Sequence, residues 1–108
     1  MNEFGTPADI DVAGAIEKVK KGSRLIWVLG NLDARRHARL QEVSEDVYLM
    51  DPEEIMESKD PEKLVGRSPV LVCEHGVTSM FLAKELRKRH IEAFSIDGGV
   101  EGMFKWHS

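Results

Sequence analysis

The sequence predicts an α/β protein with a central, mostly parallel sheet of four or five strands and helices on both faces. Two observations support this prediction. Short apolar runs without polar alternation are typical of strands buried on both faces, and amphipathic helical patterns lie between these runs. A chain of 108 residues is long enough for one such domain and too short for two. Residues 1–108 are therefore expected to form a single domain.

Four apolar runs are the predicted strands. They are Arg24 to Leu29, Val47 to Met50, Val70 to Cys73 and Ala93 to Ile96. Before the first run, residues 1–8 are expected to be a loose terminus.

Helix signals fill the intervals between the strands. Asp9 or Asp11 can cap a helix that runs to about Lys21, and Asp33 can cap another that runs through Leu40. The other helical segments are expected from Pro52, from Pro61 to Leu64, from about Ser79 to Arg89, and around Met103 and Phe104.

Composition limits the possible partners and locations. Hydrophobic residues make up 42% and charged residues 31%, as in ordinary globular proteins. The net charge of -4 predicts no general attraction to nucleic acid or to an anionic membrane. Apolar runs are far shorter than the roughly 20 residues of a membrane span. Because the first residues also lack a basic, apolar leader, a cytoplasmic location is expected.

The single cysteine marks the candidate site. Cys73 ends a predicted strand and precedes a loop and a helix, and ligands of parallel sheets bind at the carboxyl ends of strands. Successive amide groups and the helix dipole make such a loop an anion cradle, and Gly76 lets the backbone curl. Thr78 and Ser79 add hydroxyl donors, so Cys73 is expected to react as a thiolate. The alternative is a buried structural cysteine.

These residues resemble a known active-site loop. The run from Cys73 to Thr78, Cys-Glu-His-Gly-Val-Thr, is similar to the six-residue loop of rhodaneses, which reads Cys, two variable residues, Gly, a variable residue, then Arg or Thr. The resemblance extends from Ser68 to Met103 and includes Asp97-Gly98-Gly99, similar to the closing Gly-Gly segment of that family. It implies a rhodanese-like fold, in a divergent member of the family.

The resemblance also implies sulfurtransferase activity through a persulfide on Cys73, without a metal or an organic cofactor. The expected substrates are a small-molecule sulfur donor, thiosulfate or a persulfide, and a thiol or cyanide acceptor, with a sulfur-carrier protein as a candidate partner. The residues expected to bind the transferred sulfur follow the cysteine: Glu74, His75, Gly76, Val77, Thr78 and Ser79.

The front half of the chain departs from the family pattern. Trp27-Val28-Leu29 stands where rhodaneses typically carry Asp-Val-Arg, and the usual Gly-His-Ile-Pro-Gly-Ala segment is absent. Loop length also argues against the related phosphatases. They need one more loop residue and an arginine six positions after the cysteine, where this chain has Ser79, so a phosphate would lack its bidentate partner.

Two other functions remain open on the sequence. A rhodanese-like fold can serve as a docking module with an idle Cys73. A zinc site could join Cys73 and His75 to His37, His90 or His107, although this spacing matches no common zinc pattern.

Glu74 predicts a donor preference. Rhodaneses that favour thiosulfate commonly have a cation directly after the cysteine, whereas this chain has a carboxylate. Repulsion between Glu74 and a dianion predicts that thiosulfate is a poor donor and a less charged persulfide a better one. If Glu74 points into solvent, screening removes this effect.

Overall fold

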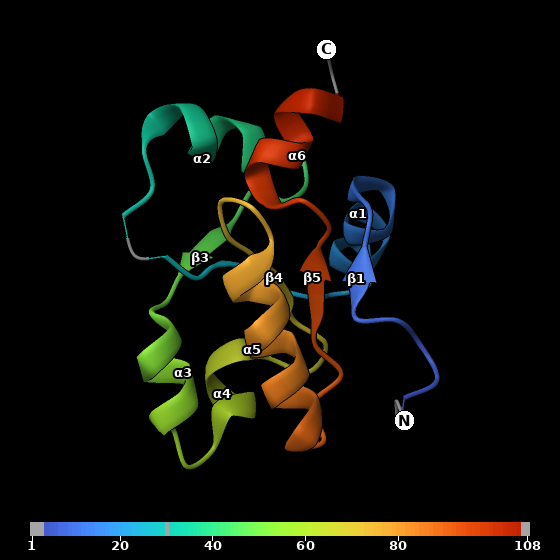
Figure 1. Ribbon diagram of the computed structural model, residues 1–108, viewed down its shortest axis with the longest axis vertical. Helices are drawn as coiled ribbons and strands as arrows, with labels where there is room; N and C mark the ends of the chain where they lie inside the picture. Colours follow the sequence, from blue (N-terminus) through green and yellow to red (C-terminus); the bar gives the residue numbers. More distant parts are fainter. Residues whose placement is uncertain (1–3, 30, 107–108) are drawn as a thin grey trace.

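The sheet is parallel throughout. The computed structural model describes residues 4–29 and 31–106, and in this part of the chain the strands follow the order β1-β5-β4-β2-β3 (Figure 1). The strands are β1 (Asp9–Ile10), β2 (Leu25–Trp27), β3 (Val47–Leu49), β4 (Val70–Val72) and β5 (Phe94–Ile96). Every residue of β2, β4 and β5 is buried, as expected where helices cover both faces. The predicted α/β architecture is confirmed.

Six helices lie between or after the strands in the described residues. They are α1 (Val12–Lys20), α2 (Ala34–Leu40), α3 (Pro52–Glu57), α4 (Pro61–Val65), α5 (Val77–Lys88) and α6 (Gly99–Trp106). The predicted caps are present: Asp11 accepts a hydrogen bond from the amide of Gly14, and Asp33 from that of Arg36. No helix within residues 4–29 and 31–106 has the length and apolar character needed to cross a membrane.

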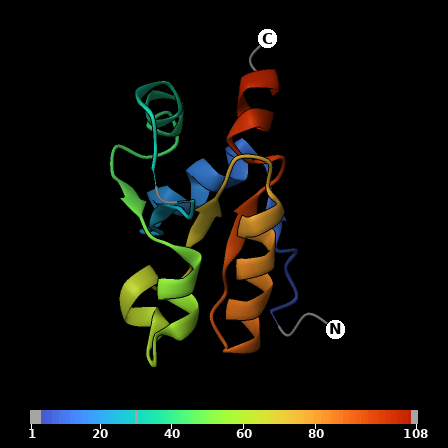
Figure 2. The same ribbon diagram turned by 60° about the vertical axis from the view of Figure 1, so that its left-hand side comes forward.

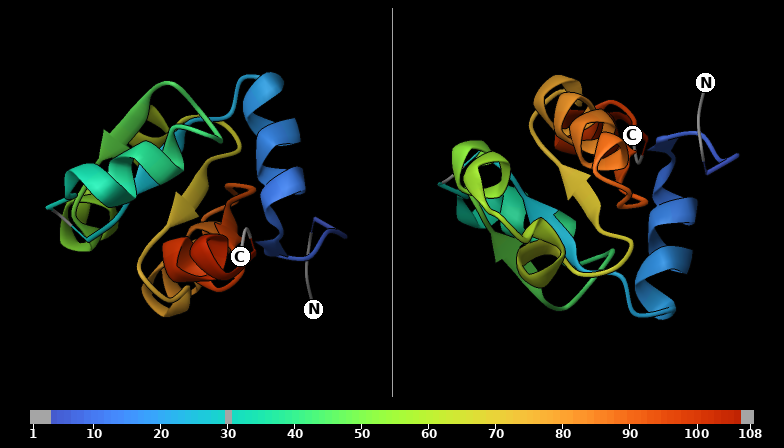
Figure 3. Two further views of the ribbon diagram at one scale, coloured as in Figure 1. Left: turned by 90° about the horizontal axis from the view of Figure 1, so that it is seen from above. Right: turned by 90° about the horizontal axis from the view of Figure 1, so that it is seen from below.

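The two faces of the sheet carry separate cores. Alternate strand residues point to opposite faces, so Leu25 and Trp27 face one core while Ile26 and Val28 face the other. Residues of α1, α2 and α6 complete the first core, and residues of α3, α4 and α5 complete the second. Seen along the long axis, β4 lies between α1 and the α3–α4 pair (Figure 3). Cys73 belongs to the second core, under α5.

The first strand was not predicted. Only Asp9 and Ile10 form β1, which is too short to leave an alternating or apolar pattern. Its neighbours are nevertheless fixed, because the amide of Ser95 donates to the carbonyl of Ala8 at 2.7 Å. The expectation of a loose terminus over residues 1–8 is therefore wrong for Thr6 to Ala8. Residues 1–3 lie outside the described part of the chain.

Arg87 connects this N-terminal segment to the end of α5. Arg87 stands in a run of basic residues, Lys84 to Arg89, yet it is only 8% exposed. Its Nε donates to the carbonyl of Ala93 at 2.8 Å, and its Nη1 donates to that of Thr6 at 2.6 Å. A buried guanidinium is thus satisfied by backbone carbonyls of two chain segments.

We expect Arg87→Met to lower the free energy of unfolding by about 2 to 4 kcal/mol, because the carbonyls of Ala93 and Thr6 would lose charge-assisted donors in a buried place. Urea unfolding measures the change. Arg89→Met is the matched control, since Arg89 also donates to two carbonyls, those of Met56 and Ser58, but on the surface. Equal losses in the two variants would contradict a special role for Arg87.

Candidate active site

Cys73 lies directly after β4, where the chain turns into α5. Its Sγ accepts hydrogen bonds from the amides of Gly76 at 3.1 Å and Ser79 at 3.3 Å, and the thiol donates to the Ser79 hydroxyl at 3.3 Å. Cys73 is 2% exposed. Two backbone donors at the N-terminus of a helix therefore face the sulfur, which is an arrangement that stabilises negative charge on it.

The loop needs glycine at its turn. Gly76 has a φ of 90° and forms the N-cap of α5, so the helix begins at Val77, two residues before the predicted start at Ser79. A Cβ at this position would lie 3.1 Å and 3.2 Å from the amide nitrogens of Gly98 and Gly99. Gly76 thus combines a left-handed conformation with a close approach to the segment after β5.

A pair of buried hydroxyls lies next to the sulfur. The Oγ atom of Ser79 is 2.7 Å from the Oγ atom of Ser95, and both residues are fully buried. Ser95 comes from the middle of β5, between Phe94 and Ile96. Ser95 was not predicted as a site residue. A lone polar residue inside a buried strand was the available signal, because buried hydroxyls require partners. Cys73, Ser79 and Ser95 form one hydrogen-bonded series.

The N-terminus of α6 supports the other side of the loop. The amide of Val100 donates to the carbonyl of Cys73 at 2.9 Å, and the amide of Glu101 donates to that of Glu74 at 3.0 Å. Gly99 permits this contact, because a Cβ there would lie 2.4 Å from the Cys73 carbonyl oxygen. In two views the loop after β4 rises toward α2 and α6, at one end of the sheet (Figures 1 and 2).

Glu74 is paired with an arginine of α2. The Glu74 carboxylate accepts from Arg36 Nη2 at 2.6 Å, and Glu101 accepts from the same nitrogen at 3.3 Å. Arg36 also pairs with Asp33, the cap of its own helix. The amide and the guanidinium of Arg36 both donate to Asp33 and lower its pKa, and the same pair raises the pKa of Arg36. Arg36 was not predicted as a site residue, since it lies 38 positions from Glu74.

Comparisons with known proteins bear on the fold. Neither the protein-family models nor the curated proteins gave a match. Among solved structures, a rhodanese homolog from the extremely thermophilic bacterium Thermus thermophilus shares 20% identity over 86% of this chain and 96% of its own, with a TM-score of 0.61. A rhodanese-related protein from Thermoplasma volcanium shares 16% identity over 93% of each chain, with a TM-score of 0.64. The chain has a rhodanese-like fold.

A third similar structure agrees with this identification. A rhodanese-like domain protein from Staphylococcus aureus shares 17% identity over 90% of this chain and 91% of its own, with a TM-score of 0.61. Low identity in all three comparisons fits the divergence that the front half of the sequence shows. Identity at this level establishes the rhodanese-like fold and leaves the activity to the site itself.

The predicted site residues lie together in one loop of this rhodanese-like fold, but they differ in their contacts. Within the described residues, Sγ of Cys73 receives hydrogen bonds only from Gly76 and Ser79. His75 and Val77 are exposed, and Val77, the first residue of α5, is 76% exposed. Their predicted role in binding the transferred sulfur stays a prediction.

Trp27 fills the place of a polar segment that is typical of rhodaneses. Where rhodaneses typically place a polar Asp-Val-Arg segment, Trp27 is 3% exposed and belongs to the core under α1 and α6. Its Nε1 donates to the carbonyl of Asn31 at 3.1 Å. An apolar side chain with one satisfied polar atom thus occupies the end of β2.

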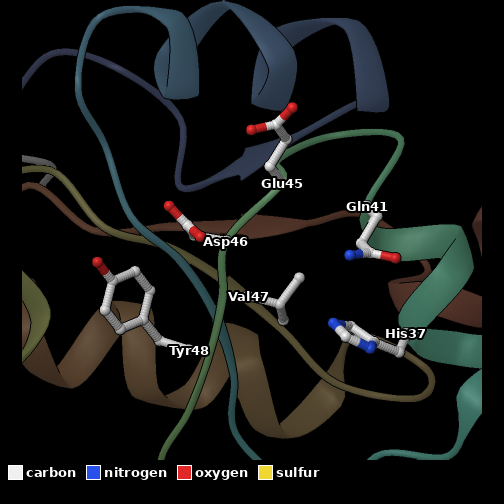
Figure 4. Close-up of a pocket in the computed structure, with 6 residues that line it drawn as sticks. All are labelled: His37, Gln41, Glu45, Asp46, Val47 and Tyr48. Carbon is white, nitrogen blue, oxygen red and sulfur yellow. The ribbon is translucent and has the colours of Figure 1, made fainter.

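His37 lies in a different place from the sulfur. It lines an open hollow together with residues at the end of α2, before β3 and in β3 (Figure 4): Gln41, Glu45, Asp46, Val47 and Tyr48. No group of three or more His, Cys, Asp or Glu side chains in residues 4–29 and 31–106 is arranged to hold a metal ion. His107, also considered as a zinc ligand, lies outside the described residues.

Proposed function

We propose that this protein is a sulfurtransferase that carries the transferred sulfur on Cys73. The observation behind the proposal is the pair of amide groups, from Gly76 and Ser79, that donate to Sγ at the N-terminus of α5. A nucleophile that alternates between thiolate and persulfide anion gains from fixed donors, because these need no reorganisation during the reaction. The remaining loop amides, those of Glu74, His75, Val77 and Thr78, are proposed to hold the outer sulfur.

The proposed reaction has two covalent steps. In the first, the Cys73 thiolate attacks the outer sulfur of thiosulfate or of a persulfide. A new S–S bond forms on Cys73 while the bond to the leaving group breaks, and sulfite or the donor thiolate departs with the electron pair. In the second, a thiolate or cyanide attacks the outer sulfur and Cys73 leaves as a thiolate. Neither step needs an external oxidant or reductant.

The setting proposed for this chemistry is the cytoplasm, where thiols are kept reduced. A small thiol or cyanide would act as acceptor, and a sulfur-carrier protein remains a candidate partner. Because Cys73 is only 2% exposed, an attacking group can reach its sulfur only past the residues of the surrounding loop. The same burial favours a second candidate function, a docking module in which Cys73 stays idle.

Mass spectrometry separates the two functions. After incubation with thiosulfate, we expect a mass gain of about 32 Da on the peptide that contains Cys73, because one sulfur atom is added. Subsequent cyanide should remove this mass and release thiocyanate. Untreated protein and the Cys73→Ser variant serve as controls. If neither thiosulfate nor a small persulfide such as cysteamine persulfide modifies Cys73, the sulfurtransferase proposal is wrong and the docking module is favoured.

A further inference from the structure

Arg36 is surrounded by carboxylates from three parts of the chain. Its partners are Asp33 at the start of α2, Glu74 in the cysteine loop and Glu101 in α6. The side chains of Glu74 and Glu101 stay 40% and 34% exposed, so their negative charge also faces solvent. We call Asp33, Arg36, Glu74 and Glu101 the arginine cluster.

The arginine cluster carries excess negative charge next to the reacting sulfur. Three carboxylates and one guanidinium leave a net charge of -2. Glu74 directly follows Cys73, and the backbone of Glu101 is bonded to that of Glu74. Because Glu74 belongs to the cysteine loop itself, the charge of the cluster acts on a donor that approaches Cys73.

We infer that the arginine cluster selects the sulfur donor by charge, and that Arg36 is its specificity-determining residue. Both terminal nitrogens of the guanidinium are already paired with carboxylates, so the favoured donors are those with little negative charge, such as neutral or zwitterionic persulfides. This inference rests on the proposed sulfurtransferase function. It differs from repulsion by Glu74 alone, because Arg36 offsets part of the charge of Glu74 and Glu101 adds to it.

Two donors that differ by one charge test the inference. Thiosulfate carries two negative charges, whereas methanethiosulfonate carries one, since a methyl group replaces one oxygen anion. Both deliver the same kind of outer sulfur, with sulfite or methanesulfinate as the leaving group. With cyanide at a fixed, saturating concentration, kcat/KM for the donor reports the first half-reaction.

Glu74→Gln should raise kcat/KM about tenfold for thiosulfate and about threefold for methanethiosulfonate at low salt. Coulomb energy is proportional to the charge of the donor, so the change in the logarithm of kcat/KM is twice as large for the dianion as for the monoanion. Arg36→Gln should lower both values with the same two-to-one logarithmic ratio, since Glu74 and Glu101 lose their cation. At 1 M salt, where the Debye length is about 3 Å, both effects should shrink.

Glu42→Gln is the matched control. Glu42 also pairs with an arginine of α2, Arg39, at 2.6 Å, but neither belongs to the cysteine loop or the arginine cluster. The control should change kcat/KM for both donors by less than about twofold. Equal changes for the two donors in Glu74→Gln, or no change, would overturn the inference. Absence of any persulfide on wild-type Cys73 with thiosulfate, methanethiosulfonate and cysteamine persulfide alike would instead overturn the proposed function.

Discussion

Cys73→Ser is expected to abolish sulfur transfer to cyanide while the protein stays folded. A serine hydroxyl is not ionised at neutral pH and cannot form a persulfide, so turnover should fall by about three orders of magnitude or more. The fold should persist, because a hydroxyl can accept from the amides of Gly76 and Ser79 as the sulfur does. Thiocyanate formation from thiosulfate and cyanide measures the loss.

The matched control for this variant is Ser44→Ala. Ser44 is bonded on the surface to the carbonyl of Asp46, far along the chain from the cysteine loop, so turnover should stay at the wild-type level. Circular dichroism and thermal melting would establish that Cys73→Ser is folded. A folded serine variant that keeps wild-type turnover would show that Cys73 is not the nucleophile.

Gly99→Ala is expected to disrupt both the loop and the activity. The added methyl group would lie 2.4 Å from the Cys73 carbonyl oxygen and 2.5 Å from that of Glu74, closer than such atoms can approach. The backbone φ of 63° adds strain for any residue with a Cβ. Moving the loop away would break the hydrogen bonds that α6 donates to it. We expect a loss of unfolding free energy of about 3 kcal/mol or more, and a large fall in kcat.

Gly22→Ala is the control for backbone strain alone. Gly22 also has a positive φ, 105°, but a Cβ there would meet no atom within 4 Å. Its substitution should cost about 1 to 2 kcal/mol and leave kcat unchanged. Urea unfolding and the thiocyanate assay, applied to both variants, separate the two causes. If Gly99→Ala keeps the loop active and costs no more than Gly22→Ala, the close contact does not hold the loop in place.

Features encoded by neighbouring residues were predicted from the sequence. The apolar runs of β2, β4 and β5 located the centre of the sheet, because strands buried on both faces leave an unbroken apolar pattern. The cap Asp33 was predicted, and Asp11 was one of two candidates beside Asp9, because a capping side chain bonds an amide three residues away. The position of Cys73 between a strand, a loop and a helix was also predicted, because neighbouring residues encode all three.

Features encoded by distant residues were missed. The pairing of Arg36 with Glu74 joins α2 to the cysteine loop, and no local pattern links two charged residues so far apart. In the sequence, Ser95 is one polar residue in an apolar strand, and only the tertiary structure brings it next to Ser79. The same holds for Arg87, which belongs to a run of basic residues and has a partner in the N-terminal segment, 81 positions away. These contacts depend on tertiary structure.

The parallel pairing of β1 with β5 affects the order in which the protein can be assembled during synthesis. Asp9 pairs with Ser95, so β1 emerges from the ribosome long before its only neighbouring strand in the described sheet exists. In contrast, β2 and β3 are close in sequence and can pair early, and β4 then adds to β2. The first strand to be made is therefore the last to join the sheet. A nascent chain that stops before Phe94 leaves one edge of β4 open to pairing with other chains.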